Sequence, residues 1–371
     1  MLPKTRVLAA LEHRRPDRIP TGEIGADYPI TEQALGRRTL YRAKWREYQA
    51  LWDGRRDEYV TSCKRDLVDL VRKFEWDFVP VFLVPAAGRQ SRPIRFLDEY
   101  TWEEADGRIM QFSPESEGHA VCVRHLPLAE ALAREAAAGP IEPSQLELVE
   151  HVVAELGQTH FILGRGGDGT LPHERYGLTE LLVAMIDRPD LVHEAIRRST
   201  QRALAINDAL LAAGCDGVLE GDDYCSTKGP MMSPASFREF VLPALTQLAQ
   251  AAHAQGKYFI KHTDGNTWRI FEMLLEAGID GWHGIQASAG MDLARLKACY
   301  GERVCFFGGV DVDLLVDGTC EQVHAAATKA ITAAGENGGL VLTSGNSLMV
   351  GVRYENYLAM LAAIREWTLA V

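Results

Sequence analysis

Short apolar runs of strand length alternate with longer stretches of helical periodicity from about residue 74 to the end of the chain. Such alternation is typical of βαβ units, in which helices connect parallel strands. The pattern predicts strands at residues 77–83, 159–163, 217–220, 258–261, 281–285, 304–307 and 340–343. Amphipathic helices are expected at residues 178–186, 237–254, 268–276, 293–300, 323–334 and 354–368. The spacing between strands, roughly 20 to 40 residues, favours an α/β fold of the (β/α)8 TIM barrel type, with seven of eight strands visible.

The segment from residue 86 to residue 128 departs from this pattern. Its short alternating pieces, at residues 108–112 and 120–124, are joined by Gly, Ser, Pro and Asp. This pattern predicts a β-hairpin insertion or lid. An N-terminal helix is expected at residues 4–13, and the sequence contains no internal repeat or low-complexity tract. We therefore expect a single barrel domain over residues 1–371.

The charge of the chain excludes some classes of partner. The formal net charge is −12 and the pI is about 5.4, so nucleic acid and anionic membrane surfaces are not expected to bind. No apolar run approaches the ~18 residues that a membrane span needs. The seven cysteines are scattered without a C-x-x-C pair, as is typical of reduced thiols. We expect a cytoplasmic protein that acts on a small molecule.

Polar and glycine residues follow the predicted strands one after another. In a barrel of this type, catalytic groups lie at the carboxyl ends of the strands, because that face is built from the loops that follow them. The segments that follow the strands here are residues 164–169, 220–224, 262–266, 283–286, 308–311 and 344–347. Their carboxylates and imidazoles on one rim predict a binding or catalytic pocket.

The strongest local signal is His262-Thr263-Asp264. Side chains alternate along an extended strand, so His262 and Asp264 are expected to point the same way. Such a pair can ligate one metal ion, or it can form a general base with its orienting partner. The alternative is that Asp264 caps the following helix while His262 packs inward.

A second cluster places three carboxylates in four positions, at Glu220, Asp222 and Asp223, with Tyr224 next to them. Crowded carboxylates repel one another, so one of them tends to hold a proton or a cation. The cluster favours a metal, an amine or a hydrogen-bonded sugar-like or pyrrolic ligand. The alternative is a solvated turn in which the aspartates cap the backbone.

Three other segments add weaker signals. His283 and Gln286 follow the next strand, and the glycine pair before Asp311 allows a ligand to approach the backbone closely. The run Gly164-Arg165-Gly166-Gly167-Asp168-Gly169 could cradle an anion, but it lacks the spacing of the known phosphate-binding loops.

Several motifs together resemble the uroporphyrinogen decarboxylase superfamily, and the resemblance covers nearly the whole chain. They are Pro16-Asp17-Arg18-Ile19-Pro20, Gly214–Asp216, Ser233-Pro234-x-x-Phe237-x-x-Phe240-x-x-Pro243, the His262 strand, Gly278-x-Asp280-Gly281, Asp292-Leu293-x-x-Leu296-Lys297-x-x-x-Gly301 and Gly308-Gly309-Val310-Asp311. The resemblance implies a TIM barrel with one of two chemistries. These are cofactor-free decarboxylation of porphyrinogen acetates, and zinc-dependent methyl transfer between methylated corrinoid proteins and thiols or related acceptors.

Two departures argue against haem-pathway decarboxylation. The decarboxylases carry an Arg-Gln-Ala-Gly-Arg-Tyr segment, where this chain has Gly22-Glu23-Ile24-Gly25-Ala26-Asp27-Tyr28. They also have a catalytic aspartate in a Phe-Ser-Asp-like segment, where this chain reads Val81-Phe82-Leu83-Val84-Pro85. An acidic pocket would moreover repel a substrate with many carboxylates.

The chain also departs from the methyltransferases. Their His-x-Cys pair reads His262-Thr263-Asp264 here, and their later Pro-Gly-Cys-like turn reads Ser344-Gly345-Asn346. Oxygen ligands are harder than thiolates, so such a site is expected to bind zinc less tightly. The resemblance implies a metal held by His262 and Asp264, with Glu220 as a third ligand.

The leading hypothesis is a methyltransferase-like enzyme that moves a methyl group between a small methylated substrate, such as an aryl methyl ether or a methylated amine, and cobalamin. The chain lacks the Asp-x-His-x-x-Gly signature of corrinoid carriers, so a separate corrinoid protein is expected as the partner. The expected catalytic residues are Asp222, Asp223 and His283, and the expected substrate-binding residues are Tyr28, Tyr224, Gln286, Asp311 and Asn346.

Two alternatives remain open at this point. One is a decarboxylase or other lyase acting on a small carboxylic acid, with a proton supplied from the acidic loop. The other is a non-catalytic ligand-binding barrel that has lost its thiolate ligands. The resemblance also allows a homodimer.

Overall fold

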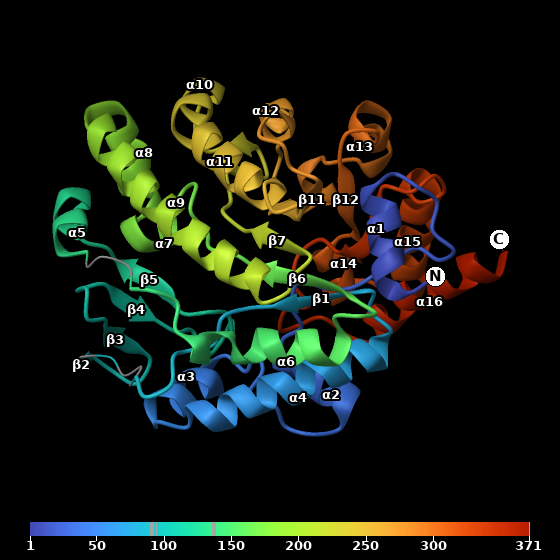
Figure 1. The fold of residues 1–371 in the computed structure, drawn as a ribbon, viewed down its shortest axis with the longest axis horizontal. Coiled ribbons are helices and arrows are strands. Elements are labelled where there is room, and N and C mark those ends of the chain that lie inside the picture. Colours follow the sequence, from blue (N-terminus) through green and yellow to red (C-terminus); the bar gives the residue numbers. More distant parts are fainter. Residues whose placement is uncertain (90–92, 94, 136–138, 371) are drawn as a thin grey trace.

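Seven parallel strands form the central sheet of this protein, whose computed structural model describes residues 1–89, 93, 95–135 and 139–370 (Figure 1). The strands are β1 (Phe78–Val81), β6 (Phe161–Arg165), β7 (Gly217–Glu220), β10 (Tyr258–His262), β11 (Gly281–His283), β12 (Cys305–Val310) and β13 (Leu340–Ser344). They lie side by side in that order. Each coincides with a strand predicted from the sequence, so the predicted TIM-barrel fold is confirmed.

A short N-terminal segment occupies the position of the eighth strand. The Leu342 amide on β13 donates to the Pro20 carbonyl oxygen at 2.9 Å, and the Asp77 amide before β1 donates to the Thr21 carbonyl oxygen at 2.6 Å. The Thr21 hydroxyl also donates to the Leu342 carbonyl oxygen, at 2.7 Å. Residues 20–21 therefore bridge the two edge strands, although their sequence has no strand-like apolar run.

Helices cover the outside of the barrel (Figure 1). The longer ones are α4 (Arg56–Phe74), α6 (Glu147–Leu156), α8 (Leu178–Asp187), α9 (Pro189–Ala212), α11 (Leu242–His253), α15 (Cys320–Ala334) and α16 (Tyr354–Ala370). Shorter helices are α2 (Tyr28–Leu35), α3 (Trp45–Trp52), α5 (Leu128–Arg134), α7 (His173–Tyr176), α10 (Pro234–Ser236), α12 (Phe271–Glu276), α13 (Leu293–Tyr300) and α14 (Val312–Asp317). Among the described helices, none is both long enough and apolar enough to cross a membrane.

Large apolar side chains fill the barrel interior, and helix α1 (Pro3–Leu11) closes its amino-terminal end. The interior cluster includes Phe161, Leu163, Leu219, Ile260, Phe307 and Val341 from the strands, together with Val7, Ala10 and Leu11 of α1. The Lys4 amide donates to the Thr159 carbonyl oxygen just before β6, at 2.8 Å. With one end closed by α1, the carboxyl end of the barrel is left for the functional side chains.

The 86–128 segment contains a four-stranded antiparallel sheet of β2 (Arg95–Phe96), β3 (Thr101–Glu103), β4 (Ile109–Gln111) and β5 (Val121–Arg124). Aromatic contacts hold this sheet against α3: the Trp52 and Trp102 ring centroids are 4.9 Å apart, and those of Trp45 and Phe112 are 5.0 Å apart. In Figure 1 the sheet lies on the opposite side of the barrel from α1.

Candidate functional site

Three side chains that can bind a metal converge at the carboxyl ends of β7 and β10. Asp223, His262 and Asp264 each offer one ligand atom, and these atoms all lie within 4.8 Å of one another. The His262 Nε2 atom is 3.9 Å from Asp223 Oδ1 and 3.9 Å from Asp264 Oδ2. The Asp264 amide donates to Asp223 Oδ1 at 2.9 Å, which ties the two loops together. We refer to these three residues as the His262 group.

A second histidine fixes the His262 ring. The Nδ1 atoms of His262 and His283 are 2.7 Å apart, so one ring donates a hydrogen bond to the other. Burial, followed by nearby positive charge, lowers the pKa of His262 to about 3, and burial lowers the pKa of His283 well below its usual value. Both rings are therefore neutral. If His262 Nδ1 is the donor, its Nε2 lone pair faces the two carboxylates, as a metal ligand requires.

Asp264 has an unusual environment for a carboxyl group. Its Oδ2 atom accepts a hydrogen bond from Asn346 Nδ2 at 2.6 Å. Burial and the neighbouring Asp223 charge raise the pKa of Asp264 to about 7. A cavity of about 120 Å³ reaches Asp264, Gln286, Asp311 and Asn346, so four residues predicted from the sequence line one space.

Asp311 and Gln286 also have contacts of their own. Asp311 precedes α14, and its carboxylate accepts hydrogen bonds from the amides of Ser288, at 3.0 Å, and Asp313, at 3.4 Å. The Gln286 side-chain oxygen accepts a hydrogen bond from the Gly265 amide at 3.1 Å. Both side chains thus hold the loops that surround the cavity.

Glu220, predicted from the sequence as a third metal ligand, lies apart from the His262 group. It is buried and forms an ion pair with Lys261, which is fully buried as well. The sheet register explains this arrangement: Glu220 is paired with Lys261, whereas His262 is paired with His283. Neighbours in register share a face, so Glu220 and Lys261 point outward while both histidines point into the barrel.

Asp222 and Tyr224 belong to the same buried polar cluster behind the strands. Asp222 Oδ2 accepts hydrogen bonds from the amides of Thr170 and Leu171, both at 2.8 Å. The Tyr224 hydroxyl contacts the Thr170 hydroxyl, and the Lys261 ammonium lies 4.3 Å from the Tyr224 ring centroid. Burial and nearby carboxylates raise the pKa of Asp222 well above its usual value. The described contacts of Asp222 and Tyr224 hold the loop that follows β6.

Tyr28 lies in a different set of contacts. Its hydroxyl donates to the Glu117 carboxylate at 2.5 Å, and the Arg46 guanidinium lies over its ring at 4.3 Å. These contacts connect the start of α2 to the segment between β4 and β5. The described contacts of Tyr28 do not include the His262 group.

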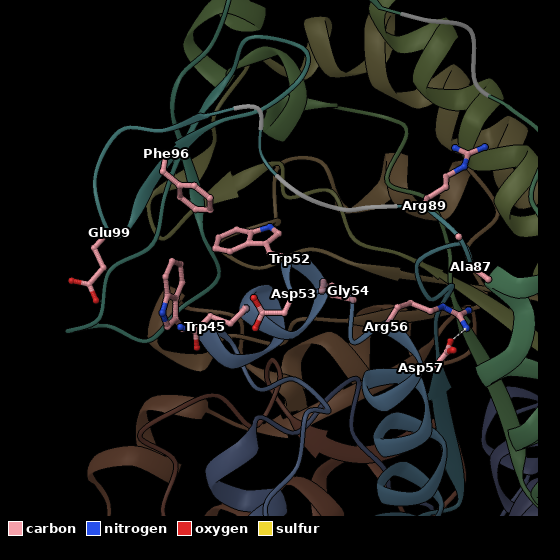
Figure 2. Close-up of a pocket in the computed structure, with 13 residues that line it drawn as sticks. Trp45, Trp52, Asp53, Gly54, Arg56, Asp57, Ala87, Arg89, Phe96 and Glu99 are labelled. Atoms are coloured by element: carbon pink, nitrogen blue, oxygen red, sulfur yellow. Dashed lines mark hydrogen bonds and ion pairs between the residues drawn. The ribbon is translucent and has the colours of Figure 1, made fainter.

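An aromatic cavity of about 760 Å³ lies between α3, the start of α4 and the insertion (Figure 2). Trp45, Trp52 and Phe96 form one side of it, and on the other side Arg56 forms an ion pair with Asp57 at 3.0 Å. Among the described residues that line this cavity, none belongs to the site predicted from the sequence. The cavity is therefore separate from the His262 group.

The sequence analysis missed a buried acid, Glu23, which packs behind β13. Its two carboxyl oxygens contact the Ser344 amide at 3.0 Å and the Ser344 hydroxyl at 2.6 Å. The same hydroxyl lies 2.6 Å from the Asn346 carbonyl oxygen. One hydroxyl proton cannot serve both acceptors, so a proton on Glu23 satisfies the arrangement. Burial raises the pKa of Glu23 to about 8, in agreement with this geometry.

This acid leads to a prediction about stability. The pKa of Glu23 rises on folding from an ordinary value of 4.5 to about 8, so the folded chain binds this proton more tightly than the unfolded chain. Its contribution to stability is full below about pH 4.5 and is lost as the pH rises through 8. Glu23→Gln should remove that dependence. The free energy of unfolding, measured with denaturant at several pH values, should therefore fall more for wild type than for Glu23→Gln as the pH rises. A difference between the two proteins that does not change with pH would refute the raised pKa of Glu23.

Comparison with known proteins places the chain among barrel enzymes of one superfamily. Residues 114–367 match the uroporphyrinogen decarboxylase (URO-D) family. The chain belongs to this family, and the resemblance predicted from the sequence is confirmed.

The similar proteins include a methyltransferase and a decarboxylase. The chain is 26% identical over 227 residues to the methylcobamide:CoM methyltransferase MtaA of Methanosarcina barkeri, covering 61% of this chain and 64% of that protein. It is 24% identical over 192 residues to a uroporphyrinogen decarboxylase of Coxiella burnetii, covering 50% of each. The chain thus spans less than two thirds of the length of these relatives.

The whole fold is also found among solved structures. A methyltransferase from Methanosarcina mazei superposes with a TM-score of 0.73 and 20% sequence identity, covering 99% of each chain. At this level of identity, the likeness supports the fold and does not decide the reaction.

Proposed function

We propose that this protein is a metal-dependent methyltransferase that moves a methyl group between a small methylated substrate and the cobalamin of a separate corrinoid protein. The observation that carries the proposal is the His262 group, at the carboxyl ends of β7 and β10. The similarity to MtaA, a methylcobamide:CoM methyltransferase, supports the choice of methyl transfer.

The donor atoms of the His262 group fit a divalent cation. One imidazole nitrogen and two carboxylates form a ligand set that zinc accepts, with room for substrate or water at the remaining positions. Because this set contains no thiolate, harder cations than zinc also fit it. When bound, the metal would act as a Lewis acid toward the heteroatom that carries the methyl group.

Other residues would position the reacting groups. The His283 ring holds the His262 ring through the 2.7 Å contact, and Asn346 orients the Asp264 carboxylate. The buried His283 Nε2 atom has no hydrogen-bond partner among the described residues, so it could donate to a bound substrate. In the proposed reaction, the Co(I) of the reduced corrinoid would supply an electron pair to the methyl carbon, so that a carbon–cobalt bond forms, cobalt becomes Co(III) and the bond between heteroatom and methyl carbon breaks. The heteroatom keeps the electron pair and takes up a proton.

Methylation of cobalt provides the test. The chain, loaded with zinc, is mixed with reduced cobalamin and a panel of aryl methyl ethers and methylated amines, and formation of methylcobalamin is followed by absorbance. We expect methylation with at least one substrate, its loss after chelation and its recovery with zinc. Methylation that is unaffected by complete metal removal would contradict the metal-dependent mechanism, and no methylation of free or carrier-bound cobalamin would contradict methyl transfer itself.

Carboxy-lyase chemistry is the second candidate, favoured by the pKa of Asp264. A carboxyl group with a pKa of about 7 is suited to donate a proton near neutral pH, as decarboxylation of a small acid requires. This function predicts release of CO2 without cobalamin. A non-catalytic barrel would instead bind ligands and turn over none of them.

A further inference from the structure

Arg165 brings a positive charge to the mouth of the barrel. It is the last residue of β6, and it is exposed whereas the four residues before it are buried. Over residues 1–89, 93, 95–135 and 139–370, its guanidinium has no hydrogen bond or ion pair. Arginine usually engages several of its five donors when protein surrounds it, so these donors are available to a ligand.

The sheet register shows where the Arg165 side chain points. Phe161 and Leu163, four and two residues earlier on β6, belong to the apolar interior of the barrel. Arg165 is paired in register with Leu219, another interior residue. Since side chains alternate along a strand, Arg165 also points into the barrel.

His262 and His283 are likewise the last residues of their strands, and both point into the barrel. The guanidinium and the His262 group thus face the same space.

Neighbouring groups do not neutralise Arg165. Although solvent reaches the Arg165 side chain, the protein that surrounds it and then the Arg42 charge lower its pKa, and the opposing effect of Asp168 and Glu174 does not offset them. Arg42 itself forms an ion pair with Asp27 at 2.8 Å, and Lys44 shares the same carboxylate at 2.7 Å. The Asp27 carboxylate is therefore already engaged by Arg42 and Lys44.

The glycines beside Arg165 are explained by close packing against α9 rather than by anion binding. A Cβ at Gly166 would lie 2.2 Å from Asn207 Oδ1, and one at Gly167 would lie 2.7 Å from Ala203 Cα, both on α9. These glycines allow the loop to pack closely against α9. The recognition of an anion would therefore depend on the Arg165 side chain rather than on a glycine-rich backbone cradle.

We propose that Arg165 binds a carboxylate group of the substrate at the barrel mouth, beside the His262 group. A guanidinium presents a planar fork of donors that matches the two oxygens of a carboxylate. As a statement about the substrate, this inference rests on the function proposed above. As a statement about a binding site, it can be tested without any turnover.

The test compares carboxylates with their neutral amides. Acetate, benzoate and 4-methoxybenzoate, and the three corresponding amides, are titrated by ligand-observed NMR at constant ionic strength. We expect at least one carboxylate to bind wild type more tightly than its amide, and Arg165→Gln to weaken that binding roughly 10- to 100-fold. Arg165→Lys should restore part of the affinity, because it keeps the charge without the fork.

Arg303→Gln serves as the matched control, since Arg303 is exposed and pairs with Glu272 away from the barrel mouth. It should bind each carboxylate as wild type does. The melting temperature of each variant checks folding. The proposal is overturned if no carboxylate is preferred over its amide, or if folded Arg165→Gln retains the preference. Because no methyl transfer is measured, either result is independent of the cobalamin experiment.

Discussion

Replacing His262 by glutamine is expected to abolish metal binding and to reduce methyl transfer by more than about 100-fold. Loss of a residue that merely supports a ligand already costs roughly 10- to 100-fold in metal affinity or activity, so loss of a ligand should cost more. Glutamine keeps a similar size but lacks the imidazole lone pair that faces Asp223 and Asp264. Metal content by mass spectrometry and the initial rate of methylcobalamin formation measure the two effects.

His324→Gln is the matched control for this substitution. His324 lies on α15, and its Nε2 atom forms a hydrogen bond with the carboxylate of Glu366 on α16 at 2.9 Å. This variant should keep both its metal and its rate. Wild-type metal content and activity in folded His262→Gln would contradict the role given to His262.

Lys261→Met is expected to lower the free energy of unfolding by about 3–5 kcal/mol, because it leaves a buried charge unpaired. The Lys261 ammonium is fully buried against Glu220, and it also donates to the carbonyl oxygens of Asp222 and His262, both at 2.6 Å. Methionine fills much of the same volume but cannot replace these contacts. Denaturant unfolding followed by circular dichroism measures the loss.

The double variant Glu220→Gln with Lys261→Met separates the ion pair from the other contacts. Removing both charges should cost less than the sum of the two single losses, because neither charge is then left unpaired. The control is the exposed ion pair of Arg303 and Glu272, where Arg303→Gln should lower the free energy of unfolding by at most about 1 kcal/mol. A loss below about 1 kcal/mol for Lys261→Met would show that the buried pair is unimportant.

The fold was predictable from the sequence wherever a strand is a continuous apolar run. The seven parallel strands contain short apolar runs of this kind, some ending in polar residues, and each was located within a few residues. The segment at Thr21 was not recognisable, because its role depends on two edge strands that lie far away in the sequence. Helices α4 and α9 were not predicted either, although both are long.

Part of the candidate site was predictable from one local rule, the alternation of side chains along a strand. Alternation along a single strand predicted that His262 and Asp264 point the same way, and their side chains do lie close together. Whether Glu220 lies beside these two residues depends on the register between β7 and β10, which a sequence alone does not give. Leu219, an apolar residue one position earlier, was the available sign that Glu220 points outward.

Glu23 and Arg165 could not be assigned from the sequence for a different reason. Their properties arise from what surrounds them: burial for Glu23 and the lack of a described partner for Arg165. Both depend on the packing of distant segments. The glycine-rich run did draw attention to Arg165, but for its backbone rather than its charge.

Metal stoichiometry tests the central claim most directly. Wild type, Asp223→Asn and Asp311→Asn are incubated with zinc, desalted and measured for metal per chain. Both variants remove one carboxylate from the same rim, but only Asp223 belongs to the His262 group. We predict about one equivalent in wild type and in Asp311→Asn, and a clear loss in Asp223→Asn. A wild-type chain that retains no metal, or an Asp223→Asn chain that retains a full equivalent, would contradict the account.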